Sequence, residues 1–377
     1  MRRVLEDVRS WQRSALISVV LFVGLGISAA APCLAQADTA FPGLAQQMLD
    51  AKVVELDLVG VSVAIAKDGV LVWEGGAGLR DRERNLPAGP DMVHRIASIT
   101  KAMTATAVMQ LVESGEVDLE GPLQDYVPSF PESDKGVLRI HHLLNHTSGI
   151  RHYFGRENRP TERYESLQEA MQVFQDRELW FPPGEKFLYT TYGYTVLGAV
   201  IESASGRSYE DYMQEHVFVP AGMTHTGLER LEEDVPNRSE LYRRDKENGL
   251  VEDLKTDLSV KYPGGGVSST AGDLVRFGIA FSEGRLVRAE TVEEMLIEPQ
   301  VESRRSVPYG FGWMFWDDEN LGRILHQDGG QSGTSTVLRI YRDRSIVVAV
   351  LGNVARTGGE IGQIQKALVD LLIERGP

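Results

Sequence analysis

Residues 309–353, YGFGWMFWDDENLGRILHQDGGQSGTSTVLRIYRDRSIVVAVLGN, contain four strand-like runs in direct succession. The runs 309–316, 322–327, 333–342 and 344–353 are rich in aromatic and β-branched residues, and short polar or glycine-containing segments separate them. Strands that follow one another through short turns pair with their neighbours in sequence. This part of the chain therefore predicts an antiparallel meander.

A further pair of strands is expected near the other end of the chain. The stretch VGVSVAIAKDGVLVWEGGAG (59–78) predicts a hairpin that turns at Lys67-Asp68-Gly69. Apolar spacing predicts a helix at 41–55 and an amphipathic helix at 358–376. We therefore expect an α+β fold in which strands from both termini form one antiparallel sheet flanked by the terminal helices.

The middle of the chain is expected to be an inserted, mostly helical region. Residues 138–228 carry helical patterns, and another helix is predicted at 269–284. Residues 229–262 are polar and irregular, which is typical of a loop over a site. An active site would then lie where the helical region meets the sheet.

The first 37 residues are typical of a secretory signal peptide. Four arginines precede an apolar run, ALISVVLFVGLGISAAA, and the small-x-small sequence AQA at 35–37 predicts cleavage before Asp38. An uncleaved membrane anchor is the alternative. The expected organisation is thus a signal peptide at 1–37 and one domain at 38–377, exported to a periplasm or secreted, with no membrane span in the mature chain.

Cysteine content and charge restrict the chemistry of the mature chain. Cys33 is the only cysteine and lies in the leader, which excludes disulfides, thiolate metal sites and a cysteine nucleophile. The formal charge is −15, and the leader holds four arginines against one glutamate and one aspartate, or +2, which leaves about −17 for the mature chain. Such a charge repels phosphate backbones, so nucleic acid is not expected as a partner.

The stretch SITKAMTATAVMQLVESGEV (98–117) predicts an apolar helix that begins with a serine three residues before a lysine. Residues three apart share a helix face, so Nζ of Lys101 would reach Oγ of Ser98. Near a helix start, Ser98 would gain the positive end of the dipole and a free backbone N–H as an oxyanion donor. Burial or a cationic neighbour would make Lys101 a proton acceptor. Taken alone, the pattern also fits an ordinary helix start capped by serine.

Two further stretches carry polar groups suited to a site. In FPPGEKFLYTTYGYTVLG, Tyr189 precedes a helix, and a phenol beside a lysine can serve as an acid or a base. A packed aromatic ring is the alternative for Tyr189. In HQDGGQSGTSTVL, Gly330 would offer a strand-edge N–H as the second oxyanion donor, with His326 beside it.

Taken together, these stretches resemble the serine beta-lactamase-like family, which includes penicillin-binding DD-peptidases, class C beta-lactamases and related esterases. Within that family the chain is most similar to the mitochondrial beta-lactamase-like branch and its bacterial relatives. Six ordered stretches between residues 60 and 355 carry the resemblance: RIASITKAMT, LQDYVPSFPE, LLNHTSGIRHY, FLYTTYGYTVLG, PGGGVSSTAGDLVRFG and GGQSGTSTVL.

The resemblance implies a role for each matching residue. Ser98 matches the acylated nucleophile and Lys101 its proton acceptor, while Tyr189 matches the tyrosine of the family's second motif. That motif usually ends in asparagine, which binds a substrate amide, and this chain has Thr191 there. The absence of the asparagine puts binding of a beta-lactam in doubt.

The third motif departs further from the family pattern. Alignment without a gap places Gln327 at the position of the family's lysine or histidine, followed by Asp328, so that His326 stands one residue early. A shift of one residue turns a strand side chain to the opposite face, unless a bulge near Gly329 restores His326 to the cleft. Without that bulge the site would lack a cation there and would prefer neutral esters or amides.

The resemblance implies an exported serine hydrolase that forms an acyl-enzyme on an amide or ester carbonyl of a small-molecule or peptide substrate. No cofactor is implied, and a homo-oligomer is compatible with it. A catalytically weak binding or assembly protein on the same fold is one alternative. A zinc hydrolase that uses the His141–His146 cluster is another, although no glutamate stands between His142 and His146 as it does in a zincin motif.

Overall fold

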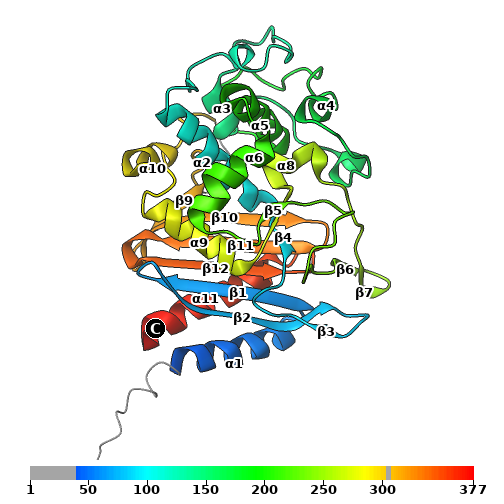
Figure 1. Cartoon of the computed structure of the whole chain (residues 1–377), viewed down its shortest axis with the longest axis vertical. Coiled ribbons are helices and arrows are strands. Elements are labelled where there is room, and N and C mark those ends of the chain that lie inside the picture. Colours follow the sequence, from blue (N-terminus) through cyan, green and yellow to red (C-terminus); the bar gives the residue numbers. More distant parts are fainter. Residues whose placement is uncertain (1–39, 303–306) are drawn as a thin grey trace, which may run out of the picture.

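The computed structural model describes residues 40–302 and 307–377, and the expected signal peptide lies outside them. The main sheet has seven antiparallel strands in the order β3-β2-β1-β12-β11-β10-β9 (Figure 1). These strands are β1 (Gly60–Lys67), β2 (Val70–Asp81), β3 (Leu86–Pro87), β9 (Met314–Asp318), β10 (Gly322–Gln331), β11 (Thr334–Tyr341) and β12 (Ile346–Gly352). The predicted antiparallel sheet built from both ends of the chain is therefore confirmed.

The centre of the sheet joins the two ends of the chain. Strand β1 pairs with β12 from Val61 opposite Gly352 to Lys67 opposite Ile346. Both strands are buried on both faces, which explains why their sequences are continuously apolar rather than alternating. Helices α1 (Ala40–Glu55) and α11 (Gly358–Arg375) pack on one face of the sheet, and α9 (Ala271–Ser282) packs on the other.

The inserted region between β3 and β9 carries most of the helices and two small sheets (Figure 1). Its α-helices are α2 (Thr100–Glu113), α3 (Ile140–Leu144), α4 (Leu167–Met171), α5 (Thr191–Ser205), α6 (Tyr209–Met213), α7 (Val219–Ala221), α8 (Tyr262–Gly265), α9 and α10 (Ala289–Met295). The small sheets are β4 (His94–Arg95), β8 (Val267–Ser269) and β5 (Gly227–Leu228), and the hairpin of β6 (Tyr242–Asp245) and β7 (Gly249–Glu252). This hairpin lies in the segment that we expected to be irregular throughout.

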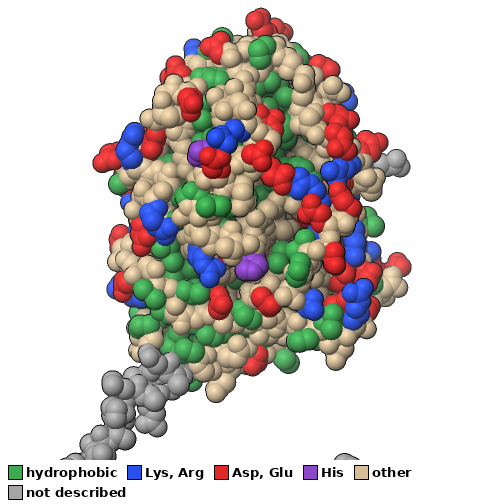
Figure 2. All heavy atoms as spheres, viewed as in Figure 1, with side chains coloured by type: hydrophobic (Ala, Val, Ile, Leu, Met, Phe, Trp, Pro, Cys, Tyr) green, Lys and Arg blue, Asp and Glu red, His purple; other side chains and the backbone are tan. Residues whose placement is uncertain are grey.

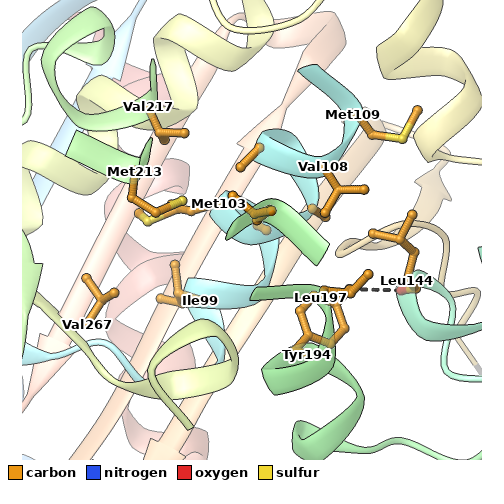
Figure 3. Packing of buried hydrophobic residues seen from close by; sticks show 14 of the residues in the cluster. Ile99, Met103, Val108, Met109, Leu144, Tyr194, Leu197, Met213, Val217 and Val267 are labelled. Carbon is orange, nitrogen blue, oxygen red and sulfur yellow. Dashed lines mark hydrogen bonds between the residues drawn. The ribbon is translucent and has the colours of Figure 1, made fainter. Parts of the chain in front are cut away.

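Helix α2 runs through the middle of the helical region. Its residues from Thr100 to Met109 are all buried, which accounts for a sequence that is apolar on every side. Figure 3 shows Met103 and Val108 of α2 among side chains of α5 and near Met213 of α6. Tyr194 of α5 donates a hydrogen bond to the carbonyl oxygen of Leu144 over 2.8 Å. Packing on all sides holds the start of α2 in one position relative to α5.

The surface carries mixed charge. Figure 2 shows Asp and Glu side chains interspersed with Lys and Arg on one face, and no broad basic patch is visible on that face. This distribution agrees with the formal charge of −15. In the described part of the chain, no helix combines the length and the apolar character that crossing a bilayer requires.

Candidate active site

Ser98 lies in a short 3-10 turn (Ala97–Ile99, η1) that leads directly into α2. Ser98 is partly exposed, whereas Ala97 and Ile99 are buried. Ala97 has a φ of +47°, in the left-handed region that residues with a side chain rarely adopt. Such strain costs about 1–3 kcal/mol and persists only where surrounding contacts enforce it. The backbone is therefore held in a conformation that presents Ser98 to the surface.

Three strands enforce this conformation. The Ile96 N–H donates to the carbonyl oxygen of Val267 in β8 over 3.0 Å, and the Ile96 carbonyl oxygen accepts from Oγ1 of Thr336 in β11 over 3.1 Å. A Cβ on Gly329 of β10 would overlap both that carbonyl oxygen and the Thr336 hydroxyl. Glycine is thus required at 329, because it lets β10 lie directly against the backbone that precedes Ser98.

Lys101, the second residue of α2, is fully buried, and its Nζ lies beside Ser98. Its Nζ lies 3.2 Å from Oγ of Ser98, 3.3 Å from Oγ1 of Thr191 and 2.5 Å from the carbonyl oxygen of Gly264. All three partners are uncharged oxygens. A lysine in this setting has hydrogen bonds but no carboxylate to stabilise its charged form.

The pKa of Lys101 is lowered well below its usual value, first by burial and then by the positive charge of Lys261. A lowered pKa favours the neutral amine form of lysine, which can accept a proton. This arrangement gives Ser98 a base within hydrogen-bond distance.

Tyr189 also lies beside Lys101, at the residue before the N-cap of α5. Nζ of Lys101 is 4.9 Å from the centroid of the Tyr189 ring and 5.6 Å from that of Tyr194. The Tyr189 ring in turn packs against the His146 imidazole, with 4.3 Å between centroids. The structure therefore brings together Ser98, Lys101, Tyr189 and Thr191, the four residues that the sequence placed in the first two motifs.

Two imidazoles position the start of α5. The backbone N–H of Thr190 donates to Nδ1 of His146 over 3.2 Å, and that of Thr191 donates to Nδ1 of His152 over 3.1 Å. Burial, followed by the charges of Lys101 and Lys261, lowers the pKa of His152 to about 4. Both rings accept a hydrogen bond, and His152, which the sequence analysis did not single out, is held neutral near the site.

The histidines of the 141–146 segment do not assemble a zinc site. His141 Nδ1 contacts the carbonyl oxygen of Leu119, and His142 Nδ1 accepts from the N–H of Arg139. Across residues 40–302 and 307–377, no group of three or more His, Cys, Asp or Glu side chains is arranged to hold a metal ion. The zinc alternative therefore has no ligand set in the described structure.

Strand β10 settles which side chain of the third motif faces the helical region. Its pairing with β11 runs from Ile324 to Gln331 without a register shift, so the bulge that would have turned His326 is absent. Gln327 is fully buried, and its amide donates to the Tyr309 hydroxyl over 2.9 Å and to the carbonyl oxygen of Gly312. His326 points to the opposite face, where its ring packs edge-on against Trp316 at 4.6 Å.

His326 and Asp328 are therefore not brought to the nucleophile. Asp328 shares the face of His326, and its carboxylate lies 2.5 Å from Nη1 of Arg339. Of the two arrangements that the sequence left open, the one that places His326 in the cleft is not observed, because successive side chains alternate along an unbroken strand.

Gly330 occupies the open edge of β10. In the described chain, β9 pairs with β10 only as far as His326, so the edge beyond it carries no further strand. A Cβ at Gly330 would meet nothing within 4 Å, which marks open space beside the strand. The Gln331 amide next to it donates to the carbonyl oxygen of Gly265 over 3.2 Å, and this bond joins β10 to the wall of the site.

Lys261 and Arg95 are site neighbours that the sequence analysis missed. Lys261 is 3% exposed and directly precedes α8, the helix that supplies the Gly264 carbonyl oxygen. Arg95, just before the nucleophile turn, is paired with Glu229. Arg95 opens the stretch RIASITKAMT, but nothing in its spacing indicates a pairing with Glu229, and only folding brings Lys261 near the nucleophile.

Comparisons with known proteins agree with this geometry. A family model described as Beta-lactamase matches residues 45–369. The human protein "Serine beta-lactamase-like protein LACTB, mitochondrial" is 32% identical over 338 residues, which cover 70% of this chain and 62% of the relative. Penicillin-binding protein 4* of Bacillus subtilis (strain 168) is 29% identical over 314 residues, covering 78% of this chain and 67% of the relative. The chain thus spans less than two thirds of the mitochondrial relative.

Solved structures show the same architecture. The octameric penicillin-binding protein homologue from Pyrococcus abyssi superposes with a TM-score of 0.75 at 29% sequence identity, covering 88% of this chain and 77% of that one. The resemblance inferred from the six ordered stretches is confirmed by the family match and by these relatives.

Proposed function

Because the chain belongs to the beta-lactamase family, a family of serine hydrolases, we propose that it hydrolyses an amide or ester through an acyl-enzyme on Ser98. One observation carries the proposal. The buried Nζ of Lys101 lies 3.2 Å from Oγ of Ser98 and has no carboxylate partner among residues 40–302 and 307–377. A serine hydroxyl becomes a nucleophile when an adjacent base can take its proton, and this pair meets that requirement.

The proposed reaction proceeds in two balanced halves. Lys101 accepts the hydroxyl proton as Oγ of Ser98 bonds to the substrate carbonyl carbon. The backbone N–H groups of Ser98 and Gly330 hold the oxygen that becomes negative. Tyr189 donates a proton to the leaving amine or alcohol as its bond to carbon breaks, and Lys101 passes the proton taken from Ser98 to Tyr189. Water then attacks the ester carbonyl of the acyl-enzyme. Tyr189 and Lys101 transfer a proton from this water to Oγ of Ser98, which releases the acid and free Ser98.

The side chains around the nucleophile favour uncharged acyl donors. Thr191 stands where the family motif usually has an asparagine, whose side-chain amide would bind an amide group of the substrate. His326 points away from the cleft. Thr191 instead accepts a hydrogen bond from Lys101 and so takes part in positioning the base. We therefore propose that small neutral esters or amides are the preferred substrates and that peptides belong to the broader range of substrates.

Export and assembly are further parts of the proposal. The leader at 1–37 supports export to a periplasm or the exterior, with the hydrolase domain spanning 38–377. The octameric state of the Pyrococcus abyssi homologue supports a homo-oligomer for this chain. A catalytically weak binding or assembly protein on the same fold is the competing function, and an active nucleophile would argue directly against it.

The test is intact-protein mass spectrometry after incubation with a fluorophosphonate and, separately, with a penicillin. We expect one fluorophosphonate adduct per chain, its complete loss in Ser98→Ala, and slower formation in Lys101→Ala. Ser114→Ala is the matched control, because it removes a serine hydroxyl at the far end of the same helix. Folded protein that takes up neither reagent would overturn the hydrolase assignment in favour of binding or assembly.

A further inference from the structure

Lys261 is a buried lysine whose ammonium has no carboxylate within ion-pair distance among the described residues. Its side chain lies almost wholly inside the protein, and its ammonium makes neither a hydrogen bond nor an ion pair within the described part of the chain. The nearest defined contact is the face of Tyr153, whose ring centroid is 5.2 Å from Nζ. An unpaired buried charge lowers the stability of the folded state, so a lysine at this position is expected to have a function that offsets this cost.

The other charges near Lys261 are already satisfied by one another. Arg95 donates to Glu229 over 2.7 Å and to the hydroxyl and carbonyl oxygens of Thr256, each over 2.9 Å. The second carboxylate oxygen of Glu229 accepts from the hydroxyl of Ser268 over 2.8 Å. The Arg95–Glu229 pair is thus neutral as a unit, and the charge of Lys261 remains uncompensated.

Lys261 connects to the catalytic lysine by two routes. The first is through side chains: Lys261 lies over the ring of Tyr153, which packs against the His152 ring with 3.8 Å between centroids. Nδ1 of His152 accepts from the backbone N–H of Thr191, and the Thr191 hydroxyl accepts from Lys101. The second is through the chain, because Lys261 stands three residues before Gly264, whose carbonyl oxygen accepts from Lys101. The two lysines therefore share one wall of the site.

We propose that Lys261 is a positioning residue whose buried charge keeps Lys101 in the amine form, ready to accept the proton of Ser98. The proposal rests on the hydrolase function proposed above. It assigns Lys261 no contact with substrate. Only one of two close, buried lysines can easily hold a proton at neutral pH, and the surroundings determine which one does.

The surroundings lower the pKa of both lysines. Burial and the charge of Arg95 lower the pKa of Lys261 to about 8, with Glu229 acting in the opposite direction. Burial and the charge of Lys261 lower the pKa of Lys101 well below its usual value. The polar and titratable side chains near Lys101 are Ser98, His152, Tyr189, Tyr194 and Lys261. Those near Lys261 are Arg95, His152, Tyr153 and Glu229.

The direction of the expected pH effect follows from the positive charge of Lys261. Acylation requires the amine form of Lys101, so the rate rises as pH passes upward through the pKa of Lys101. The charge of Lys261 moves that rise to lower pH. Its removal must move the rise to higher pH and leave the limiting rate at high pH unchanged.

The experiment measures the rate of Ser98 labelling by an uncharged fluorophosphonate between pH 5 and pH 10. The variants are Lys261→Met, Lys261→Gln and Lys261→Arg. In the methionine and glutamine variants we expect the midpoint of the acidic limb to rise by about one pH unit or more, which means about tenfold slower labelling on the limb. Arginine keeps the charge and should hold the midpoint near that of the wild type.

Thermal unfolding accompanies the labelling. Removal of an uncompensated buried charge should leave the melting temperature of Lys261→Met unchanged or higher. A purely structural lysine would instead lower the melting temperature and leave the midpoint in place. If one neutral variant does not fold, the other gives the midpoint.

Three outcomes overturn the inference. The first is stoichiometric labelling of folded Lys261→Met and Lys261→Gln with the wild-type midpoint. The second is a wild-type midpoint with a raised KM only for esters that bear a carboxylate, which would make Lys261 a substrate receptor. The third is a displaced midpoint in Lys261→Arg equal to that of Lys261→Met. Failure of wild-type Ser98 to react at all would instead refute the hydrolase function.

Discussion

Arg95 and Glu229 form an ion pair of 2.6 Å between side chains that are 2% and 4% exposed. The pair joins β4 to the residue after β5 in the three-stranded sheet that carries the backbone into the nucleophile turn. Loss of one partner would leave a buried charge unpaired, which costs about 3–5 kcal/mol. We therefore expect Glu229→Gln to lower the free energy of unfolding by an amount of that order.

Urea or thermal unfolding of the purified variant measures this loss. Lys366→Ala serves as the control, because Lys366 and Asp370 form an exposed i,i+4 pair on α11. Exposed helix pairs contribute only about 0.3–0.5 kcal/mol. Equal effects at the two sites would show that the Arg95–Glu229 pair does not stabilise the fold.

Gly329→Ala and Gly330→Ala should behave in opposite ways although they are adjacent. A Cβ at 329 would overlap the Ile96 carbonyl oxygen, whereas a Cβ at 330 would meet nothing within 4 Å. Forcing a methyl group into a filled space costs about 1–3 kcal/mol. We expect Gly329→Ala to lower the melting temperature and to slow Ser98 labelling, and Gly330→Ala to unfold like the wild type. A melting temperature that is unchanged in Gly329→Ala would contradict the close approach of β10 to the nucleophile turn.

The hydroxyl of Thr191 should matter to the base more than to the fold. Thr191→Val preserves shape but removes the oxygen that lies 3.3 Å from Nζ of Lys101. We expect labelling of Ser98 to slow by roughly five- to tenfold, since one hydrogen bond is worth about 1 kcal/mol. Thr195→Val is the matched control, because its hydroxyl bonds the carbonyl oxygen of Val260 from the same helix. Both variants should lose similar stability, and only Thr191→Val should lose rate.

His94 predicts a loss of stability in acid. Burial lowers its pKa from 6.5 to about 3, and its Nε2 lies 2.9 Å from Oγ of Ser62. Between these two values the unfolded chain binds a proton that the folded chain does not, so stability falls as pH falls below 6.5. The contribution is roughly 2 kcal/mol at pH 5, from about 1.4 kcal/mol per pH unit.

The measurement is the free energy of unfolding of the wild type and of His94→Asn at pH 7 and pH 5. The gap between the two proteins should change by roughly 2 kcal/mol in favour of the variant as pH falls. His225→Asn makes the same replacement at an exposed position and is the control. A gap that is constant with pH would refute the role of His94.

The sequence predicted those parts of the fold whose periodicity is local. Strands β10 to β12 and helices α2, α9 and α11 lie close to the expected ranges, because each has its own apolar pattern and turns. The β6–β7 hairpin was missed, since only two four-residue strands support it. Short strands leave too few alternating positions to be told from a polar loop.

The candidate site was predictable only in part, for a similar reason. Ser98 and Lys101 lie within one turn of one helix, so their contact follows from spacing alone. The face of His326 depends on an unbroken register with β11, which spacing does not determine. Lys261 reaches the neighbourhood of Lys101 only through tertiary packing, from 160 residues away in the chain.

The pairing of β1 with β12 also bears on how the protein is made. Ser98 and Lys101 are synthesised early, but the strands that press Gly329 and Thr336 against the nucleophile turn come from the last quarter of the chain. Contacts between such distant segments form late, because a long loop must close first. In a growing chain on the ribosome, Ser98 would therefore be present before the contacts that position the nucleophile turn have formed. Activity would begin only when the final strands have entered the sheet.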